Sequence, residues 1–440
     1  MVNMNKEIIK IYNPWWYKNR LLTKDFKKSK NHKRLKKGTF LIYGTIGTGK
    51  ELMIQNKIKE LLNSGINPNN IIYLPMKLIS DYDIIEYLSE FINGKKNLFI
   101  FINDIDVYIS AYPEKFDRLI KIITSAKNIQ QLYLTSNYEN VNLYSKKLKN
   151  LSLIKLQSLN FFEYSKSQLD KNLLDYLTEQ RRLLKEDRFS IEKLFSVTSN
   201  IYNNKLYVAV LKNLFEEYLK SGGLIENINN YKEEKTFSEM IYDYRSKVDE
   251  LLKYLNLNIS EISNLTSEIS NAYGSIYELE SMSDDSGNAL SIIKKDYKFL
   301  QKLGIIKTVY KFDIVKGKRS SKYIKTYFID PFLFRAFIKE ADFVRFRGPL
   351  VESVLGISLI RRFGKVYFLK DKVEVDFYIK SIDLGIEVKS GAATENKYQI
   401  AFPKQKLILN SKYLRKENNL YLIPYYIFLI LLWIFNRNRF

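Results

Sequence analysis

The stretch TFLIYGTIGTGKE, residues 39–51, decides the expected fold of the first third of the chain. An apolar run of strand length (39–43) leads into a glycine-rich turn with the spacing G-x-x-x-x-G-K, and an amphipathic stretch through Leu62 follows. The glycines let backbone N–H groups converge on phosphate oxygens, the helix start adds partial positive charge, and the lysine reaches the outer phosphates. The turn therefore predicts a nucleotide-binding site made of Gly44, Thr45, Ile46, Gly47, Thr48, Gly49, Lys50 and Glu51.

The magnesium-binding part of this site departs from its usual composition at two positions. Glu51 stands where Ser or Thr normally ligates Mg²⁺; a carboxylate can replace it, but Glu51 is equally typical of a solvated acid in a first helical turn. The apolar run 98–102 ends in Asn103-Asp104 instead of Asp-Glu, with Asp106 following. We expect Mg²⁺ ligation by Glu51, Asn103, Asp104 and Asp106, and polarisation of the attacking water by Asp104. ATP binding is expected, and fast hydrolysis is left open.

Further apolar runs of strand length alternate with helical stretches along the first part of the chain. They lie at 71–74, 131–134 and 151–156, and this alternation predicts a parallel sheet with crossover helices. The run at 131–134 continues into TSN (135–137). This order along the chain predicts that Asn137 senses the outermost phosphate.

The composition excludes several classes of chemistry. The 440 residues include no cysteine and a single histidine, His32, which argues against disulfides, thiolate zinc sites and a Ser-His-Asp triad. Hydrophobic residues make up 46%, enough to build cores. Basic residues exceed acidic ones by 71 − 48 = 23, which predicts attraction to nucleic acid or anionic lipid.

The pattern divides the chain into five expected parts. A basic arm (1–38), either solvated or in contact with phosphates, precedes an α/β core (39–165) and a helical lid (166–231). Helical segments followed by two β-like runs around a basic loop outline a winged helix-turn-helix (232–330); the alternative is a helical connector with a hairpin. Residues 331–440 have the pattern of a helix followed by strands.

Acidic residues recur in this last part at positions that suit a metal site. Glu352 lies on the expected helix, Asp376 on the strand EVDFYI (374–379), and Glu387 and Lys389 on the next strand, GIEVKS. Asp376 and Glu387 are 387 − 376 = 11 positions apart, as on adjacent strands, and Glu387 and Lys389 share one face. Such a group could bind a divalent ion and activate water for attack on a phosphodiester.

The chain resembles the AAA-like P-loop ATPases of archaea and bacteria that carry a winged helix and a C-terminal PD-(D/E)XK nuclease-like domain. The resemblance is carried by NPWW (13–16), the glycine-rich turn, NDID (103–106), LQSLNFFEY (156–164) and YLKSGG (218–223). It implies an α/β fold: an AAA-like P-loop NTPase, a helical lid, a winged helix-turn-helix and a restriction-endonuclease-like α/β domain. It also implies metal ligation by Asp376, Glu387 and, as an accessory ligand, Glu352, with Lys389 orienting or deprotonating water. KLKN (147–150) stands where the family usually shows Gly-Arg, so no arginine finger is assigned.

Three functions compete. The first is an ATP-binding, hydrolysing protein acting on DNA, with ATP, Mg²⁺ and a second divalent ion as cofactors and a nuclease-like domain under nucleotide control. The second is a nucleotide-dependent DNA-binding switch without cleavage and with weak ATPase activity. The third, a membrane-associated ATPase anchored by 420–435, is disfavoured because this apolar run is short and contains Pro424, as in a buried strand followed by a core helix. We expect a cytoplasmic protein for which homo-oligomers are compatible with the resemblance.

Overall fold

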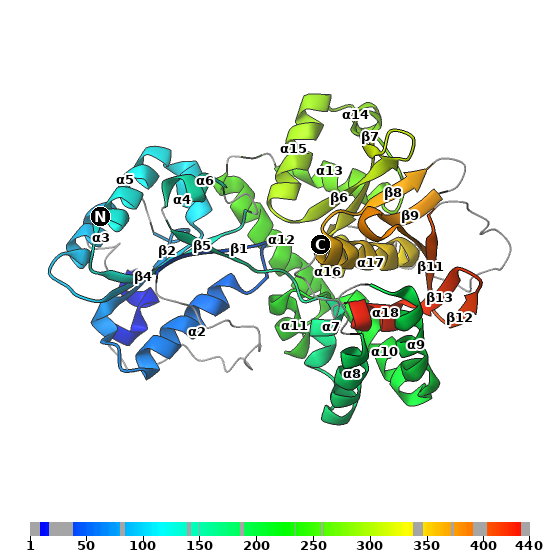
Figure 1. Ribbon diagram of the computed structural model, residues 1–440. Helices are drawn as coiled ribbons and strands as arrows, with labels where there is room; N and C mark the ends of the chain where they lie inside the picture. The colour runs from blue at the N-terminus through cyan, green and yellow to red at the C-terminus, as the bar shows by residue number, and fades with distance from the viewer. Residues whose placement is uncertain are drawn as a thin grey trace. The chain divides into compact units, whose positions relative to one another are not determined.

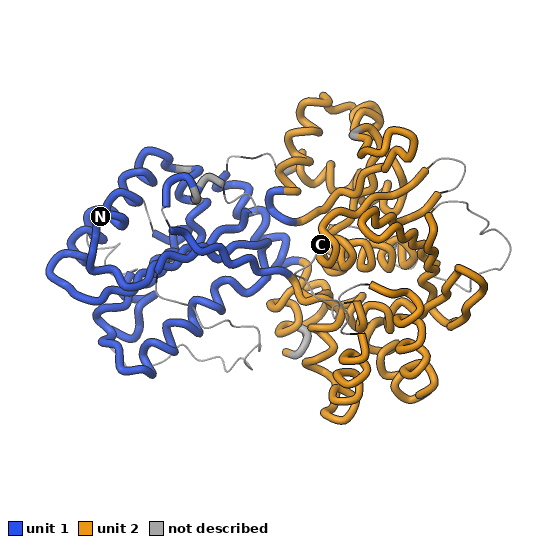
Figure 2. The backbone as a smooth tube through the Cα atoms, viewed as in Figure 1, with its two compact units in different colours: residues 1–157, 242–259, 302–304 blue, residues 158–241, 260–301, 305–440 orange. Residues whose placement is uncertain are grey.

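The computed structural model describes residues 9–16, 38–79, 84–138, 142–148, 150–184, 189–233, 235–255, 257, 259–337, 346–370, 374–389 and 403–432. The chain forms two compact units (Figure 2). Unit 1 comprises residues 1–157, 242–259 and 302–304, and unit 2 comprises the remainder. Most of the expected basic arm, including all of its lysine-rich run, lies outside the described residues.

Unit 1 is a mixed α/β unit built on a five-stranded parallel sheet (Figure 1). The strand order is β2-β3-β4-β1-β5, so β1 lies inside the sheet and β4 separates it from β3. The strands are β1 (Gly38–Tyr43), β2 (Ile71–Pro75), β3 (Leu98–Asn103), β4 (Ile129–Ser136) and β5 (Leu151–Lys155). The helices between them are α2 (Lys50–Asn63), α3 (Ile84–Ile92), α4 (Ile105–Ala111), α5 (Pro113–Ser125) and α6 (Asn142–Lys147). The expected parallel sheet is thus present.

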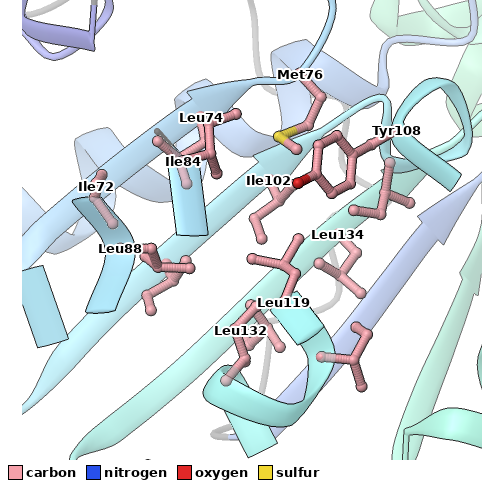
Figure 3. Packing of buried hydrophobic residues seen from close by; sticks show 14 of the residues in the cluster. Ile72, Leu74, Met76, Ile84, Leu88, Ile102, Tyr108, Leu119, Leu132 and Leu134 are labelled. Carbon is pink, nitrogen blue, oxygen red and sulfur yellow. The ribbon is translucent and has the colours of Figure 1, made fainter. Parts of the chain in front are cut away.

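Alternate residues of these strands pack on opposite faces, as the two-residue period of a strand requires. One face holds Ile72 and Leu74 of β2 with Ile102 of β3, packed against helices α3 to α6; Figure 3 shows part of this cluster. On the other face Tyr73 and Phe101 pack with α2. Both faces are covered, which explains why the strands are nearly continuous apolar runs.

The NPWW segment covers the edge strand β2. The Asn13 side-chain amide donates to the carbonyl of Tyr73 (2.9 Å) and its oxygen accepts from the Tyr73 N–H (2.7 Å). The indole N–H groups of Trp15 and Trp16 both point to the carbonyl of Ile71, at 3.3 and 2.9 Å. These side chains satisfy backbone groups that an open sheet edge would leave unpaired. The segment therefore has a structural role.

Unit 2 combines helices with a second sheet. Asn160, Asp170, Ser190 and Asn204 begin successive helices by accepting a hydrogen bond from the backbone N–H three residues on. The helices up to residue 302 are α7 (Phe161–Lys166), α8 (Lys171–Leu183), α9 (Ile191–Asn203), α10 (Lys205–Ser221), α11 (Ile225–Lys232), α12 (Phe237–Tyr254), α13 (Ile259–Asn271), α14 (Leu279–Ser286) and α15 (Leu290–Lys302). Residues 242–254 of α12 belong to unit 1.

The Gly222-Gly223 pair contacts two segments of unit 2 that are distant in sequence, around Leu159 and around Asp330. Asp330 accepts the N–H of Gly223 (2.8 Å), and the N–H of Leu159 donates to the Gly223 carbonyl (2.7 Å). A Cβ at Gly222 would overlap the Asp330 carboxylate, and one at Gly223 would overlap the Leu159 carbonyl. The two family-like segments 156–164 and 218–223 thus meet because only glycine permits their close approach.

The second sheet has eight strands in the order β12-β13-β11-β10-β9-β8-β6-β7. The strands are β6 (Ile306–Asp313), β7 (Lys318–Phe328), β8 (Tyr367–Lys370), β9 (Glu374–Ile379), β10 (Leu384–Lys389), β11 (Gln405–Asn410), β12 (Arg415–Glu417) and β13 (Leu420–Pro424). Helices α16 (Pro331–Phe337) and α17 (Arg347–Phe363) pack against β7, and α17 also packs against β10.

The basic hairpin expected as the wing is part of this sheet. β6 and β7 pair antiparallel, and β6 also pairs in parallel with β8 through Tyr310 and Lys311. The expected boundary at residue 330 therefore falls inside one continuous sheet, because the hairpin is an extension of the C-terminal strands.

The apolar segment near the C-terminus forms β13 and helix α18 (Tyr425–Leu432). Every residue of α18 is buried, and the helix packs against α7, α9, α10 and α17 of unit 2. Among the described residues, no helix is long and apolar enough to cross a membrane.

Candidate functional site

The glycine-rich turn lies between β1 and α2 and is shaped by the backbone around it. Gly44 donates its N–H to the Ser136 carbonyl (3.2 Å), and a Cβ at Gly44 would overlap the Leu156 carbonyl. Gly47 and Gly49 have φ values of 83° and 85°, which favour glycine. The start of the turn is thus held in place by the backbone at the ends of β4 and β5, and its glycines allow the positive φ angles that the turn requires.

Lys50 is buried under this turn. Its Nζ donates to the carbonyls of Gly44 (2.8 Å) and Thr45 (2.9 Å). Burial lowers the pKa of Lys50 to about 8, and the nearby Asp104 and Asp106 oppose that shift. The lysine therefore keeps its proton at neutral pH and presents a cation to the inside of the turn.

Asp104 lies just after β3, in left-handed backbone geometry with φ 55°. Its backbone N–H donates to Thr135 Oγ1 (2.8 Å), which in turn donates to Asn103 Oδ1 (2.6 Å). Asn103 is thus occupied by Thr135 and by a weaker bond from its amide to Asp104 (3.3 Å). Its oxygen is directed to the neighbouring strand, away from the role of a metal ligand.

Asn137 connects the two aspartates that follow β3. Its side-chain amide donates to Asp104 Oδ1 (3.0 Å) and Asp106 Oδ2 (3.3 Å). Asp106 is fully buried, and burial together with the charge of Asp104 raises its pKa to about 6. The structure therefore brings Lys50, Asp104, Asp106 and Asn137 together at the carboxyl ends of β1, β3 and β4.

Glu51 lies apart from these groups. It is exposed, and its Oε1 accepts a hydrogen bond from the Tyr73 hydroxyl (3.2 Å) and a longer one from Gln55 (3.4 Å). The carboxylate faces β2, so the structure supports the solvated first-turn acid among the two readings of this residue.

The sequence reasoning did not identify Lys77, which follows β2. Its Nζ lies 3.5 Å from Asp104 Oδ2 and 4.0 Å from Glu250 Oε2 of α12. The Tyr254 hydroxyl of α12 donates to the Lys77 carbonyl (2.8 Å). Lys77 also lowers the pKa of Lys50 through charge repulsion. A lysine in a short turn carries no local signal of such a position.

The residues of unit 1 fit a nucleotide with Mg²⁺. Thr45 Oγ1 is buried and has no hydrogen-bond partner among the described residues. Buried polar atoms normally have a partner, and a bound phosphate would supply one inside the turn. Mg²⁺ on a nucleotide needs only one or two protein carboxylates beside phosphates and water, so Asp104 and Asp106 would be enough to hold it there. Across the described part of the chain, no three acidic or histidine side chains form a group that could hold a metal by themselves.

The C-terminal carboxylates are also brought together, but around a lysine. Asp376 on β9 and Glu387 on β10 lie on adjacent antiparallel strands, with Glu352 on α17 nearby. Lys325 Nζ, on β7, lies 3.0 Å from Asp376 Oδ1, 3.2 Å from Glu352 Oε1 and 3.0 Å from Glu374 Oε1. Burial would lower the pKa of Lys325, but the three carboxylates raise it above its usual value.

Asp376 and Glu352 accept further hydrogen bonds, and Glu387 has a lysine partner of its own. Asp376 Oδ2 accepts the N–H of Val388 (2.9 Å), and Glu352 Oε1 accepts the Tyr327 hydroxyl (2.6 Å). Glu387 Oε2 lies 3.2 Å from Lys389 Nζ. Burial raises the pKa of Glu352 and of Glu387 to about 7. Glu352, Asp376 and Glu387, which we expected to ligate a divalent ion, therefore face ammonium groups, and this arrangement does not fit a metal.

Comparison with known proteins gives no family for the chain. No protein-family model matches it, and no curated protein matches it. Among solved structures it is similar to katanin, from a study of katanin self-assembly, with 14% identity over 44% of this chain and 58% of that chain, at a TM-score of 0.23. It is also similar to the ORC1 protein of Aeropyrum pernix in complex with DNA, with 12% identity over 72% of this chain and 90% of that chain, at a TM-score of 0.25. Both TM-scores are too low for either likeness to assign a fold or a function.

Proposed function

We propose that unit 1 binds ATP with Mg²⁺ and hydrolyses it, and that the chain is a nucleotide-dependent DNA-binding protein. The observation that carries the ATP site is the position of Lys50: its ammonium lies under the glycine-rich turn, beside the aspartates at the end of β3. In this proposal a triphosphate replaces the carbonyls of Gly44 and Thr45 as the partner of Lys50.

The site residues divide the work as follows. The backbone N–H groups of the turn and Lys50 hold the phosphates, and Asp104 and Asp106 ligate Mg²⁺ directly or through water. Asn137 donates to both aspartates. In this proposal its side chain also senses the outermost phosphate and couples that phosphate to the two carboxylates. Glu51 is left without a metal role, because its carboxylate bonds to Tyr73.

The test is titration of a fluorescent ATP analogue into wild type, Lys50→Ala and Lys121→Ala. Lys121 is an exposed lysine of α5 in the same unit and serves as the matched control. We expect Lys50→Ala to weaken binding by roughly a hundredfold, about 3 kcal/mol, and Lys121→Ala to leave it unchanged. Equal affinity of wild type and Lys50→Ala would refute the site.

A second test addresses Glu51. Replacing it by threonine restores the hydroxyl ligand that such turns usually carry next to the lysine. We expect Glu51→Thr to tighten Mg²⁺-dependent ATP binding and to raise turnover. A loss of Mg²⁺ dependence in this variant would instead assign a metal role to the Glu51 carboxylate.

DNA is proposed as the partner because of the charge of the chain and the hairpin β6–β7. The net charge is +23, and residues 314–319 at the hairpin tip, which include Lys316, Lys318 and Arg319, are exposed. Basic side chains on a projecting hairpin contact backbone phosphates, and each such contact steepens the salt dependence of binding.

The hairpin is tested by replacing Lys316, Lys318 and Arg319 together by alanine. We expect weaker binding of duplex DNA and a salt slope reduced by roughly two to three. The control is Lys212→Ala on α10, an exposed lysine away from the hairpin. An unchanged slope in the triple variant would place the DNA contacts elsewhere.

Metal-dependent DNA cleavage by unit 2 is expected from the sequence, and Asp376, Glu387 and Lys389 do lie on the adjacent strands β9 and β10, but the ammonium groups that face these carboxylates argue against it. It is tested by nicking of plasmid DNA with Mg²⁺ or Mn²⁺. Cleavage that is lost in both Asp376→Ala and Lys389→Ala would establish it. DNA binding without cleavage under these ions would leave the nucleotide-dependent switch.

A further inference from the structure

The acidic cluster of unit 2 is organised around the side chain of Lys325. This side chain is 1% exposed, and its Nζ lies 3.0–3.2 Å from one oxygen each of Glu352, Glu374 and Asp376. A lysine ammonium has three N–H donors, and three carboxylate oxygens surround it here. Each of the three carboxylates therefore has one oxygen beside the Lys325 ammonium.

Lys325 occupies the space that a metal ion between Glu352 and Asp376 would need. Carboxylate oxygens bind Mg²⁺ at about 2.1 Å and Ca²⁺ at about 2.3–2.6 Å, so a metal shared by these two residues would lie close to the position of the ammonium. Both cannot be present, since their charges repel and their volumes overlap.

The backbone around Lys325 limits where its side chain can move. Lys325 lies in the middle of β7, opposite Val309 of β6, and its chain neighbours Ile324 and Thr326 are buried. The ring of Phe368 lies 5.9 Å from its Nζ. A lysine displaced by a metal would lose its contacts with Glu352 and Asp376 while its backbone stays fixed in the sheet, which is unfavourable for a buried charge.

We propose that the Lys325 ammonium takes the place of a divalent cation between Glu352 and Asp376, so that unit 2 folds and acts without metal at this cluster. The proposal concerns unit 2 alone and does not depend on nucleotide binding by unit 1. Removal of the ammonium by Lys325→Met, which keeps the length of the apolar stem, would leave three carboxylates facing one another and would create a metal site.

The experiment counts bound Mn²⁺ by electron paramagnetic resonance, without nucleotide. All proteins carry Asp104→Asn and Asp106→Asn, which remove both proposed metal ligands of unit 1 from the count. We expect no Mn²⁺ bound at the cluster with Lys325 present, one Mn²⁺ bound in Lys325→Met, and none in Lys325→Met with Asp376→Asn. One Mn²⁺ bound in the presence of Lys325 and lost on Asp376→Asn would overturn the proposal.

Thermal unfolding provides the readout if Lys325→Met does not fold by itself. Loss of one partner from a buried ion pair leaves the other charge uncompensated, whereas loss of the whole charged group does not. We therefore expect Lys325→Met to be rescued by Mn²⁺ during refolding, and Lys325→Met/Glu352→Gln/Asp376→Asn to fold without it. For wild type, EDTA should leave the melting temperature unchanged. The proposal would also be overturned if EDTA lowered the melting temperature of wild type, if Mn²⁺ restored it, and if EDTA had no such effect on Asp376→Asn.

Discussion

The ammonium of Lys77 lies 3.5 Å from Oδ2 of Asp104, so the acid that follows β3 is paired with a lysine that follows β2. The same lysine lowers the pKa of Lys50, which places its charge close to the phosphate-binding turn. Its backbone is held by the Tyr254 hydroxyl of α12. The proposed ATP site thus contains a second cation, supplied by a neighbouring strand.

Lys77→Met should weaken ATP binding more than ADP binding, because the proposed site puts Asp104, the partner of Lys77, beside the outermost phosphate. We expect a loss of roughly tenfold for ATP and less than threefold for ADP, from the Coulomb energy of one partly buried charge. Isothermal titration with both nucleotides measures the ratio. Equal losses would assign Lys77 a structural role only, and the exposed Lys121→Ala should change neither affinity.

Gly44→Ala should destabilise unit 1 and abolish nucleotide binding. The added Cβ would overlap the carbonyl oxygen of Leu156, a backbone atom that cannot yield without moving β5. Gly65→Ala is the matched control, because Gly65 also has positive φ but a methyl group added there would meet nothing within 4 Å. We expect about 1 kcal/mol of destabilisation for the control and several times more for Gly44→Ala, measured by urea unfolding. Similar losses for both would show that the turn tolerates a side chain.

Asn137→Ala should separate ATP hydrolysis from ATP binding. The Asn137 amide donates to Asp104 and Asp106 and so orients both carboxylates, while the turn and Lys50 keep their main contacts with the phosphates. We expect turnover to fall roughly tenfold or more, with affinity changed less than threefold. Asn63→Ala, at the end of α2, is the control. A parallel loss of affinity would instead place Asn137 in nucleotide binding.

Asp330→Asn should change how stability depends on pH. Burial raises the pKa of Asp330 to about 6, from 3.8, against the hydrogen bonds from Gly223 and Phe332. A raised carboxyl pKa means that its favourable contribution is complete below about pH 4 and is lost as pH rises through about 6. We expect the stability of wild type relative to Asp330→Asn to fall over this window by on the order of 3 kcal/mol. Parallel stability curves for the two proteins between pH 4 and 7 would contradict the shift.

The strands of unit 1 were predictable because each is a short apolar run that ends at polar or glycine residues. β9 and β10 were predictable for the same reason, with Asp376 and Glu387 on adjacent strands. β7 begins at Lys318, well before the apolar run at 323–329, because its polar first half is stabilised by pairing with β6 and not by burial. A hydrophobic pattern cannot show that contribution.

The residues missed at both sites are lysines whose surroundings come from distant segments. Lys77 meets Asp104 only because β2 and β3 are neighbours in the sheet. Lys325 did carry one signal: it shares a strand face with Tyr327, within the run YIKTYFI, and a charge on the buried face of a strand requires a partner. The expected metal ligands were recognised as a group, but the cation that they surround was not.

The parallel pairing of β6 with β8 bears on how this gene can vary. A recombination event at the codon for Pro331 would separate the hairpin from the strand beside it and leave the edge of β8 open to intermolecular pairing. The same break would also remove Lys325 from the carboxylates that surround it, so the hairpin and the acidic cluster depend on one uninterrupted chain.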